Sequence, residues 1–223
     1  MKVMTKEILF DRIAQERIWR IKEIDELRKL IATRTTPFEK KKVLCRSGVV
    51  LLYAHWEGFV KKIGTLFLEY VASRRLSLGE LRTNFIAIIT KHKIGQLTES
   101  NKYSSFGDIV TYLLRDQKER AKLPFENVIN TQSNLSSVVL EEILWCLGID
   151  YQPFSIKVPL IDNRLLAIRN PIAHGDEVYV AEDEILSMIE DVLEIMDTFY
   201  NLIQPKLPPM TTIRILPRGN GLM

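Results

Sequence analysis

Cysteine is scarce in this sequence, with only Cys45 and Cys146 among 223 residues. Each lies in an apolar helical pattern, where a buried free thiol is the usual state. No second cysteine or histidine lies near either one at the spacing that a zinc site requires. We therefore expect neither a disulfide framework nor a bound metal, and this cysteine usage fits a reducing, cytoplasmic location.

Long hydrophobic runs are also missing. The longest apolar run, Val49 to Ala54, is far too short to cross a bilayer. The N-terminal residues Met1 to Phe10 lack the apolar core of a signal peptide. We therefore expect no membrane partner, and a cytoplasmic location is the default.

Glycine-rich nucleotide-binding loops and alternating strand-like segments are absent as well. Neither the P-loop fingerprint nor the dinucleotide-binding fingerprint occurs in the sequence. This argues against an α/β enzyme that hydrolyses nucleotides or transfers hydride, and we expect no cofactor.

Excess charge of one sign is small, since the formal net charge is only +3. Such a balance neither requires nor excludes a nucleic-acid partner, so the clustering of charge matters more. The pairs Lys61 with Lys62 and Lys91 with Lys93 are candidate RNA contacts. For any single cluster, a solvated helix face is the commoner explanation.

Hydrophobic periodicity predicts four long helices, of which the second has an apolar middle and is expected to be central and buried. Thr36 is its predicted N-cap, with Pro37 in the first turn, and Ser133 or Asn134 is the predicted cap of the third helix. The predicted helices cover about Lys6 to Ala32, Pro37 to Ser73, Ser133 to Leu147 and Glu182 to Gln204.

These helices indicate an all-α fold, with one domain over residues 1–205. Residues 76–131 give a weaker signal, and we interpret them as an insertion with short helices near Leu78–Lys91 and Ser105–Arg115. The proline-rich residues 206–223 form an expected extended tail, in which Thr211 to Leu216 fits a short strand or arm.

The most informative segment runs from about Leu160 through Arg169, Asn170 and Pro171 to His174. Because a residue before proline avoids the α region, we predict that the helix breaks near Asn170, which then caps a new turn starting at Pro171. A continuous helix would place Arg169 and His174 about 140° apart around its axis. A break would let both side chains point to the same side.

An arginine and a histidine side by side suit chemistry on an RNA backbone. A guanidinium binds a phosphate bidentately, and an imidazole takes and gives protons near neutral pH. RNA supplies its own nucleophile, the 2′-hydroxyl, so this cleavage needs no metal. On spacing alone, however, a helix end with a hydrogen-bonded histidine and an exposed arginine is the stronger explanation.

A resemblance to a known family changes that balance. The pattern Arg169-Asn170-x-x-x-His174 resembles the signature of the HEPN superfamily. The segment Leu51 to Lys61, which contains Tyr-Ala-His-Trp-Glu-Gly, looks like the central helix of its stand-alone bacterial nuclease branch. The similarity extends from about Lys6 to Gln204.

The resemblance implies a dimerising helical bundle with a composite cleft between two copies of the motif. It implies a metal-independent endoribonuclease that leaves a 2′,3′-cyclic phosphate, often a toxin of a toxin–antitoxin or phage-defence system. Arg169 would polarise the scissile phosphate, His174 would act as general base or acid, and Asn170 would orient the backbone or phosphate. RNA, a second copy of the chain and a cognate antitoxin are the implied partners.

Two further residues of the central helix, His55 and Glu57, are candidate supporting residues that orient Arg169 or His174. The alternatives are a core histidine for His55 and an ion pair with Lys61 for Glu57.

Two other functions compete with the ribonuclease. One is a non-catalytic, HEPN-like dimerising scaffold that binds a partner protein or nucleotide, and the retention of both Arg169 and His174 argues against it. The other is a metal nuclease, but the acidic residues 182–184 are better explained as a helix start.

Overall fold

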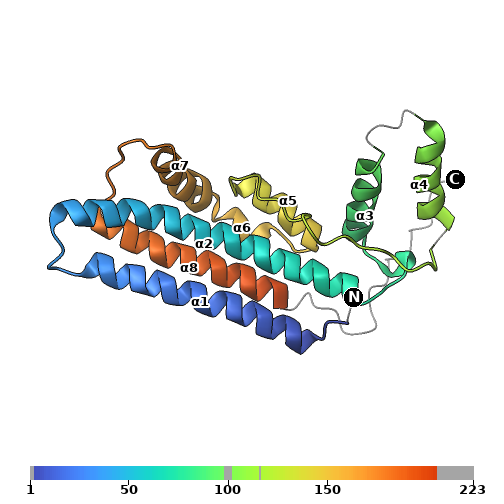
Figure 1. The fold of residues 1–223 in the computed structure, drawn as a ribbon, viewed down its shortest axis with the longest axis horizontal. Helices are drawn as coiled ribbons and strands as arrows, with labels where there is room; N and C mark the ends of the chain where they lie inside the picture. The colour runs from blue at the N-terminus through green and yellow to red at the C-terminus, as the bar shows by residue number, and fades with distance from the viewer. Residues whose placement is uncertain (1–2, 98–101, 116, 205–223) are drawn as a thin grey trace.

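A computed structural model describes residues 3–97, 102–115 and 117–204 of the chain. Three long helices, α1 (Lys6–Ala32), α2 (Phe38–Ser73) and α8 (Glu182–Ile203), pack against one another along their lengths (Figure 1). The all-α fold predicted from the sequence is confirmed. The predicted tail, residues 206–223, lies outside the described residues, and so does its expected strand near residues 211–216.

Helix α2 forms the centre of the bundle, as its apolar middle predicted. Trp56 and Phe59 of α2 are fully buried and make edge-on ring contacts with Phe199 of α8. Large aromatic side chains of this kind contribute strongly to the free energy of folding because each removes a large apolar area from water. The core therefore fixes the orientation of α2, including the face that carries the candidate site.

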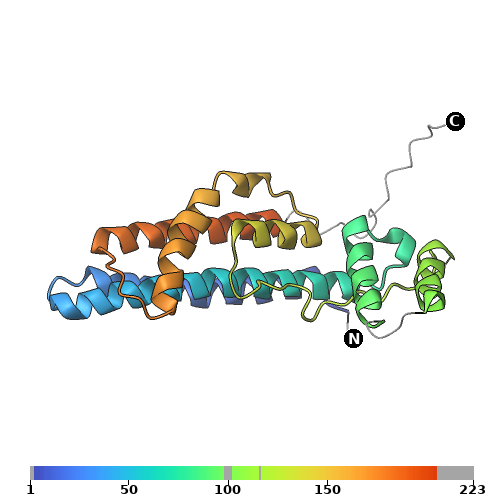
Figure 2. The same cartoon turned by 90° about the horizontal axis from the view of Figure 1, so that it is seen from above.

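A second layer of short elements covers one side of α2. It consists of α5 (Ser137–Leu147), α6 (Gln152–Ser155), a π-helical segment η2 (Pro159–Leu166) and α7 (Ala167–Ala173). Both α5 and α7 contact α2 directly. Along the long axis of the bundle the order is α7, then α5, then α3, in both views (Figures 1 and 2).

The segment predicted as an insertion lies at one end of the bundle. It contains a 3₁₀ turn, η1 (Leu78–Glu80), and the helices α3 (Thr83–Gly95) and α4 (Tyr103–Arg115). Contacts between α3 and α5 join it to the rest of the fold. Its status as an insertion within a domain of residues 1–205 stays a prediction.

Two predicted helix starts were wrong. Pro37 is itself the N-cap of α2, so Thr36 is not, and the cap of α5 is Ser136, whose hydroxyl accepts a hydrogen bond from the Val139 amide. Helix α5 begins late because Gln132 and Ser133 have φ angles of 53° and 59°. Backbone in that left-handed region ends or precedes a helix. Gly148 ends α5 with a φ of 68°.

Within the described ranges, none of the helices combines the length and the apolar character that a bilayer crossing requires.

Candidate active site

The helix that carries the Arg-Asn-Pro motif does not break before Pro171, so that prediction was wrong. The π-helical segment η2 runs directly into α7, which contains Arg169, Asn170 and Pro171 and ends at Ala173. Proline lacks the N–H that closes a helical hydrogen bond. Pro171 lies two residues before the end of a short helix, so little of the hydrogen-bond ladder is lost. Asn170 is therefore an interior residue of α7 and not a cap.

His174 is the C-cap residue of α7, and Gly175 follows with a φ of 93°. The Gly175 amide donates to the Ile172 carbonyl at 3.1 Å, and the Asp176 amide donates to the Pro171 carbonyl at 2.9 Å. This pair of hydrogen bonds is the Schellman arrangement, for which a left-handed glycine is the favoured residue. It stops the helix at the histidine, whose side chain is exposed and makes no side-chain hydrogen bond to the described residues.

Arg169 is half-buried and held from two sides. Its guanidinium carbon lies 4.3 Å from the centre of the Tyr53 ring, and its Nη1 donates to the Asn170 side-chain oxygen at 2.9 Å. A guanidinium on the face of an aromatic ring is attracted by the electrons of the ring. The Nε of Arg169 is buried without a hydrogen-bond partner in the described chain. The contacts with Tyr53 and Asn170 thus fix the orientation of the guanidinium.

Tyr53 is the side chain on which the Arg169 guanidinium rests, and 1% of its surface is exposed. Its hydroxyl accepts a hydrogen bond of 2.6 Å from the Leu135 amide. Burial, together with the nearby Glu57 carboxylate, raises the pKa of Tyr53 to about 12, although the Leu135 amide and Arg169 act in the opposite direction. The phenol is therefore neutral at any physiological pH and supports Arg169 without exchanging protons.

Glu57 lies one helical turn beyond Tyr53 on the same face of α2. Its carboxylate accepts a hydrogen bond of 2.5 Å from the hydroxyl of Thr131, which is buried. Glu57 thus joins Thr131 to the face of α2 that carries Tyr53, the residue on which Arg169 rests. The structure therefore brings Glu57 close to the candidate site, through Tyr53.

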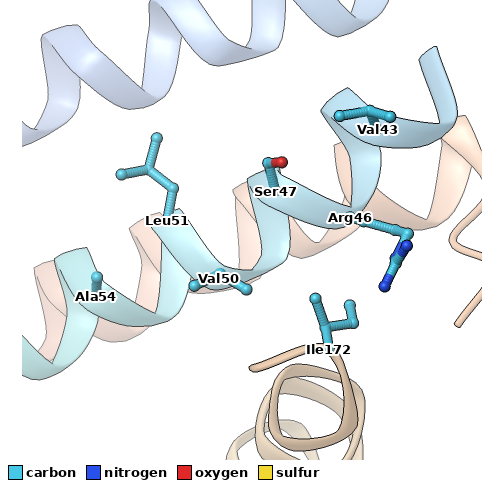
Figure 3. A pocket seen from close by; sticks show the side chains of 7 residues that line it. All are labelled: Val43, Arg46, Ser47, Val50, Leu51, Ala54 and Ile172. Carbon is cyan, nitrogen blue, oxygen red and sulfur yellow. The ribbon is translucent and has the colours of Figure 1, made fainter. Parts of the chain in front are cut away.

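A groove of about 460 Å³ lies next to α7, between it and α2. Figure 3 shows Arg46 of α2 extending towards Ile172 of α7 across this groove. Val50 and Ala54 form part of its floor, so its lining is mainly apolar. The Nη2 of Arg46 donates to the Asp176 carbonyl at 2.6 Å and so ties the turn after His174 to α2.

His55 lies elsewhere, against α1. It is 2% exposed, its Nε2 is 3.1 Å from the Glu23 carboxylate, and its ring makes an edge-on contact with Trp19. Burial lowers the pKa of His55, which Glu23 raises in part and Arg20 lowers further. Tyr53 and His55 are two residues apart and hence about 200° apart around α2, so they face opposite sides. The structure does not bring His55 to Arg169, contrary to its predicted supporting role.

The four candidate RNA-contacting lysines do not form one track. Lys61 is exposed one turn beyond Glu57 on α2, and Lys62 is exposed beside it. Lys91 and Lys93 belong to α3 at the end of the bundle, where the Lys93 ammonium lies 4.1 Å from the centre of the Tyr112 ring. Only Lys61 shares the face of α2 that carries Tyr53 and Glu57.

Arg169 and His174 diverge within one chain. Because α7 is continuous, their five-residue separation places them about 140° apart around its axis. Their surroundings agree with this geometry, since Arg169 is held against Tyr53 while His174 is exposed at the end of the helix. Within one chain, the two groups therefore do not point towards a common position.

Three contributors to the site were not predicted from the sequence. The signal for Tyr53 was its spacing of four from Glu57, which places both residues on one helix face. Gly175 directly after the histidine was the signal for the Schellman turn. Thr131 carried no signal, because its partner Glu57 is 74 residues away in the chain.

The chain belongs to the RiboL-PSP-HEPN family, whose model matches residues 15–205, and hence to the HEPN superfamily. No curated protein and no solved structure matches the chain. Residues 15–205 include α2, α7, α8 and α1 from Gln15 onwards, so the match covers most of the bundle and both motifs that suggested the resemblance.

Proposed function

We propose that the protein is a metal-independent endoribonuclease that cleaves RNA through attack of the 2′-hydroxyl on the adjacent phosphate. Its membership of a HEPN family makes such an activity possible. The observation that carries the proposal is the arrangement of α7: Arg169 is held in place by Tyr53 and Asn170, and His174 is exposed at the helix end.

In this mechanism each group has one task. Arg169 binds the scissile phosphate and stabilises the negative charge that develops on its oxygens. An imidazole takes the proton of the 2′-hydroxyl, which attacks phosphorus to form the 2′,3′-cyclic phosphate. The bond to the 5′-oxygen breaks, and that oxygen takes up a proton from water. Asn170 keeps the guanidinium in place through its side-chain oxygen.

We further propose that each site is formed by two chains. Arg169 and His174 lie about 140° apart around one α7, so a second chain is needed to bring both groups to one phosphate. A second copy seated on the apolar groove between α2 and α7 would place the two α7 helices face to face, since a twofold interface uses the same patch on both chains. Arg169 of one copy and His174 of the other would then flank the same phosphate.

Such a nuclease would act in the cytoplasm as a toxin or effector of a toxin–antitoxin or phage-defence system, restrained by a partner. This part of the proposal rests on the resemblance of the two motifs to the stand-alone nuclease branch.

The test is cleavage of a labelled RNA in excess EDTA. We expect the parent to cut and to leave a 2′,3′-cyclic phosphate, whereas His174→Ala and Arg169→Ala are inactive. Arg34→Ala, which removes an exposed arginine far from α7 in the sequence, is the matched control and should retain the parental rate. A substrate with a 2′-deoxy sugar at the cleavage position should resist.

A non-catalytic dimerising scaffold is the second candidate, because the contacts of Arg169 with Tyr53 and Asn170 also suit a purely structural arginine. That function predicts no cleavage by the parent, together with destabilisation by Arg169→Ala. Equal cleavage by the parent and His174→Ala would likewise remove the catalytic proposal.

A further inference from the structure

A second hollow lies between α3, residues 124–130 and the C-terminal half of α5, with a volume of about 610 Å³. It is separate from the groove beside α7 and shares no lining residue with it. One wall is aromatic, and the rest combines apolar and polar side chains. Trp145 is its aromatic lining residue, and its polar lining residues are Lys91, His92, Glu126, Asn127, Asn130 and Glu142.

Trp145 forms the aromatic wall, and its exposure is unusual for its size. Its side chain is on the surface of α5, with 49% of the residue exposed, whereas Trp56 is completely buried. No ring of the described residues stacks on it and no cation is seated over it, in contrast to Trp19, which carries Arg20 and His55. About half of Trp145 is thus accessible to a ligand.

The polar groups of the hollow suit the edge of such a ligand. Asn127 has a φ of 58°, a conformation that asparagine tolerates better than most residues, so this part of the loop is sharply turned. The side-chain oxygen of Asn130 accepts a hydrogen bond from the Gln132 amide at 2.8 Å, which leaves its amide hydrogens to donate. The carboxylates of Glu126 and Glu142 are acceptors only.

We propose that this hollow binds an unpaired nucleobase of single-stranded RNA, stacked on Trp145 and recognised along its edge by Asn130 and the two glutamates. An inserted, unstacked base on an aromatic side chain is a common way for proteins to hold single-stranded RNA. The acceptors favour bases that present N–H groups at the edge. Lys91 at the rim supplies a positive charge for the adjoining phosphate and disfavours a basic peptide side chain as the occupant.

The position of the hollow fits a substrate that also reaches the candidate active site. Helix α5 lies between α3 and α7 along the bundle, so a strand held at Trp145 would run past α5 towards α7 (Figures 1 and 2). This inference rests on the proposed ribonuclease function for the identity of the ligand. It adds that the substrate is unpaired RNA several nucleotides long, gripped away from the bond that is cut.

Binding is measured separately from cleavage, with the full-length chain carrying His174→Ala and a fluorescein-labelled, unstructured RNA octamer. Loss of base stacking should weaken binding by about 5- to 150-fold in Trp145→Ala. Trp145→Phe keeps a stacking ring and should retain most of the affinity. Val138→Ala removes another exposed apolar side chain of α5, outside the hollow, and should bind like the parent.

A direct signal comes from tryptophan fluorescence. In a Trp19→Phe background the remaining tryptophans are Trp145 and the buried Trp56, so quenching by added RNA reports Trp145. We expect quenching that saturates with the octamer and is abolished by Trp145→Ala.

The outcomes separate this inference from the proposed function. If the parent cleaves RNA and Trp145→Ala binds the octamer as tightly as before, the proposed base pocket is wrong and the proposed nuclease function stands. If Trp145→Ala weakens RNA binding but the parent does not cleave RNA, the base pocket is supported and the proposed nuclease function is contradicted. If an arginine-containing peptide quenches Trp145 saturably and RNA does not, the proposed ligand is wrong and the hollow binds a basic peptide side chain instead of a nucleobase.

Discussion

Tyr53 offers a sharp test of how Arg169 is held, because its ring and its hydroxyl have different partners. The ring contacts the Arg169 guanidinium, and the hydroxyl accepts the hydrogen bond of the Leu135 amide. Tyr53→Phe removes only the hydroxyl and leaves the buried Leu135 amide unsatisfied, which should lower the free energy of unfolding by about 1–3 kcal/mol. Since the phenol is neutral at working pH, the rate of RNA cleavage should change little.

Tyr53→Leu removes the ring as well. The lost contact between ring and guanidinium is worth about 0.5–2 kcal/mol, so kcat/KM for RNA should fall by a further factor of about 2 to 30 relative to Tyr53→Phe. Urea unfolding measures the stability of both variants, and cleavage is measured at a temperature at which both are folded. Equal kcat/KM in the two variants would refute the claim that the ring orients Arg169.

Two other variants test neighbouring features. Gly175→Ala should lower the free energy of unfolding by about 1–2 kcal/mol. The cause is the φ of 93° alone, since nothing lies within 4 Å of an added Cβ. A thermal midpoint equal to that of the parent would contradict the Schellman turn. Burial lowers the pKa of His55, so below about pH 6.5 the unfolded chain binds a proton that the folded chain does not. The free energy of unfolding should therefore fall as the pH drops below about 6.5, by at most ~1.4 kcal/mol per pH unit, and His55→Gln should reduce this slope in urea titrations at pH 7.5, 6.5 and 5.5. An unchanged slope would show that His55 is not held neutral against α1.

The long helices were predictable because their signals are local. Helix α1 has the predicted bounds, since its apolar residues recur at helical spacing over 27 residues. The path through Asn170 and Pro171 was mispredicted because the bias of a residue before proline was given more weight than the packing of η2 and α7 against α2. Tertiary contacts decided between a break and a continuous helix.

The site was predictable only in part. Arg169 and His174 stand out as a pair with a recognised spacing, but nothing in the sequence shows that Arg169 rests on Tyr53. His55 and Glu57 are two residues apart and hence about 200° apart around α2, so helical geometry alone shows that they do not both face Arg169. The contact between Thr131 and Glu57 depends on a loop with left-handed residues at 132 and 133, which no periodic pattern reveals.

Mixing the two inactive variants tests most directly whether Arg169 and His174 serve one site across two chains. Arg169→Ala and His174→Ala are purified separately, combined in equal amounts under conditions that allow subunit exchange, and assayed for RNA cleavage in EDTA. Half of the resulting dimers contain one chain of each kind, and one of their two sites pairs an intact arginine with an intact histidine. We predict recovery of roughly a quarter of the parental activity. A mixture as inactive as its components, in the presence of demonstrated exchange, would contradict the account.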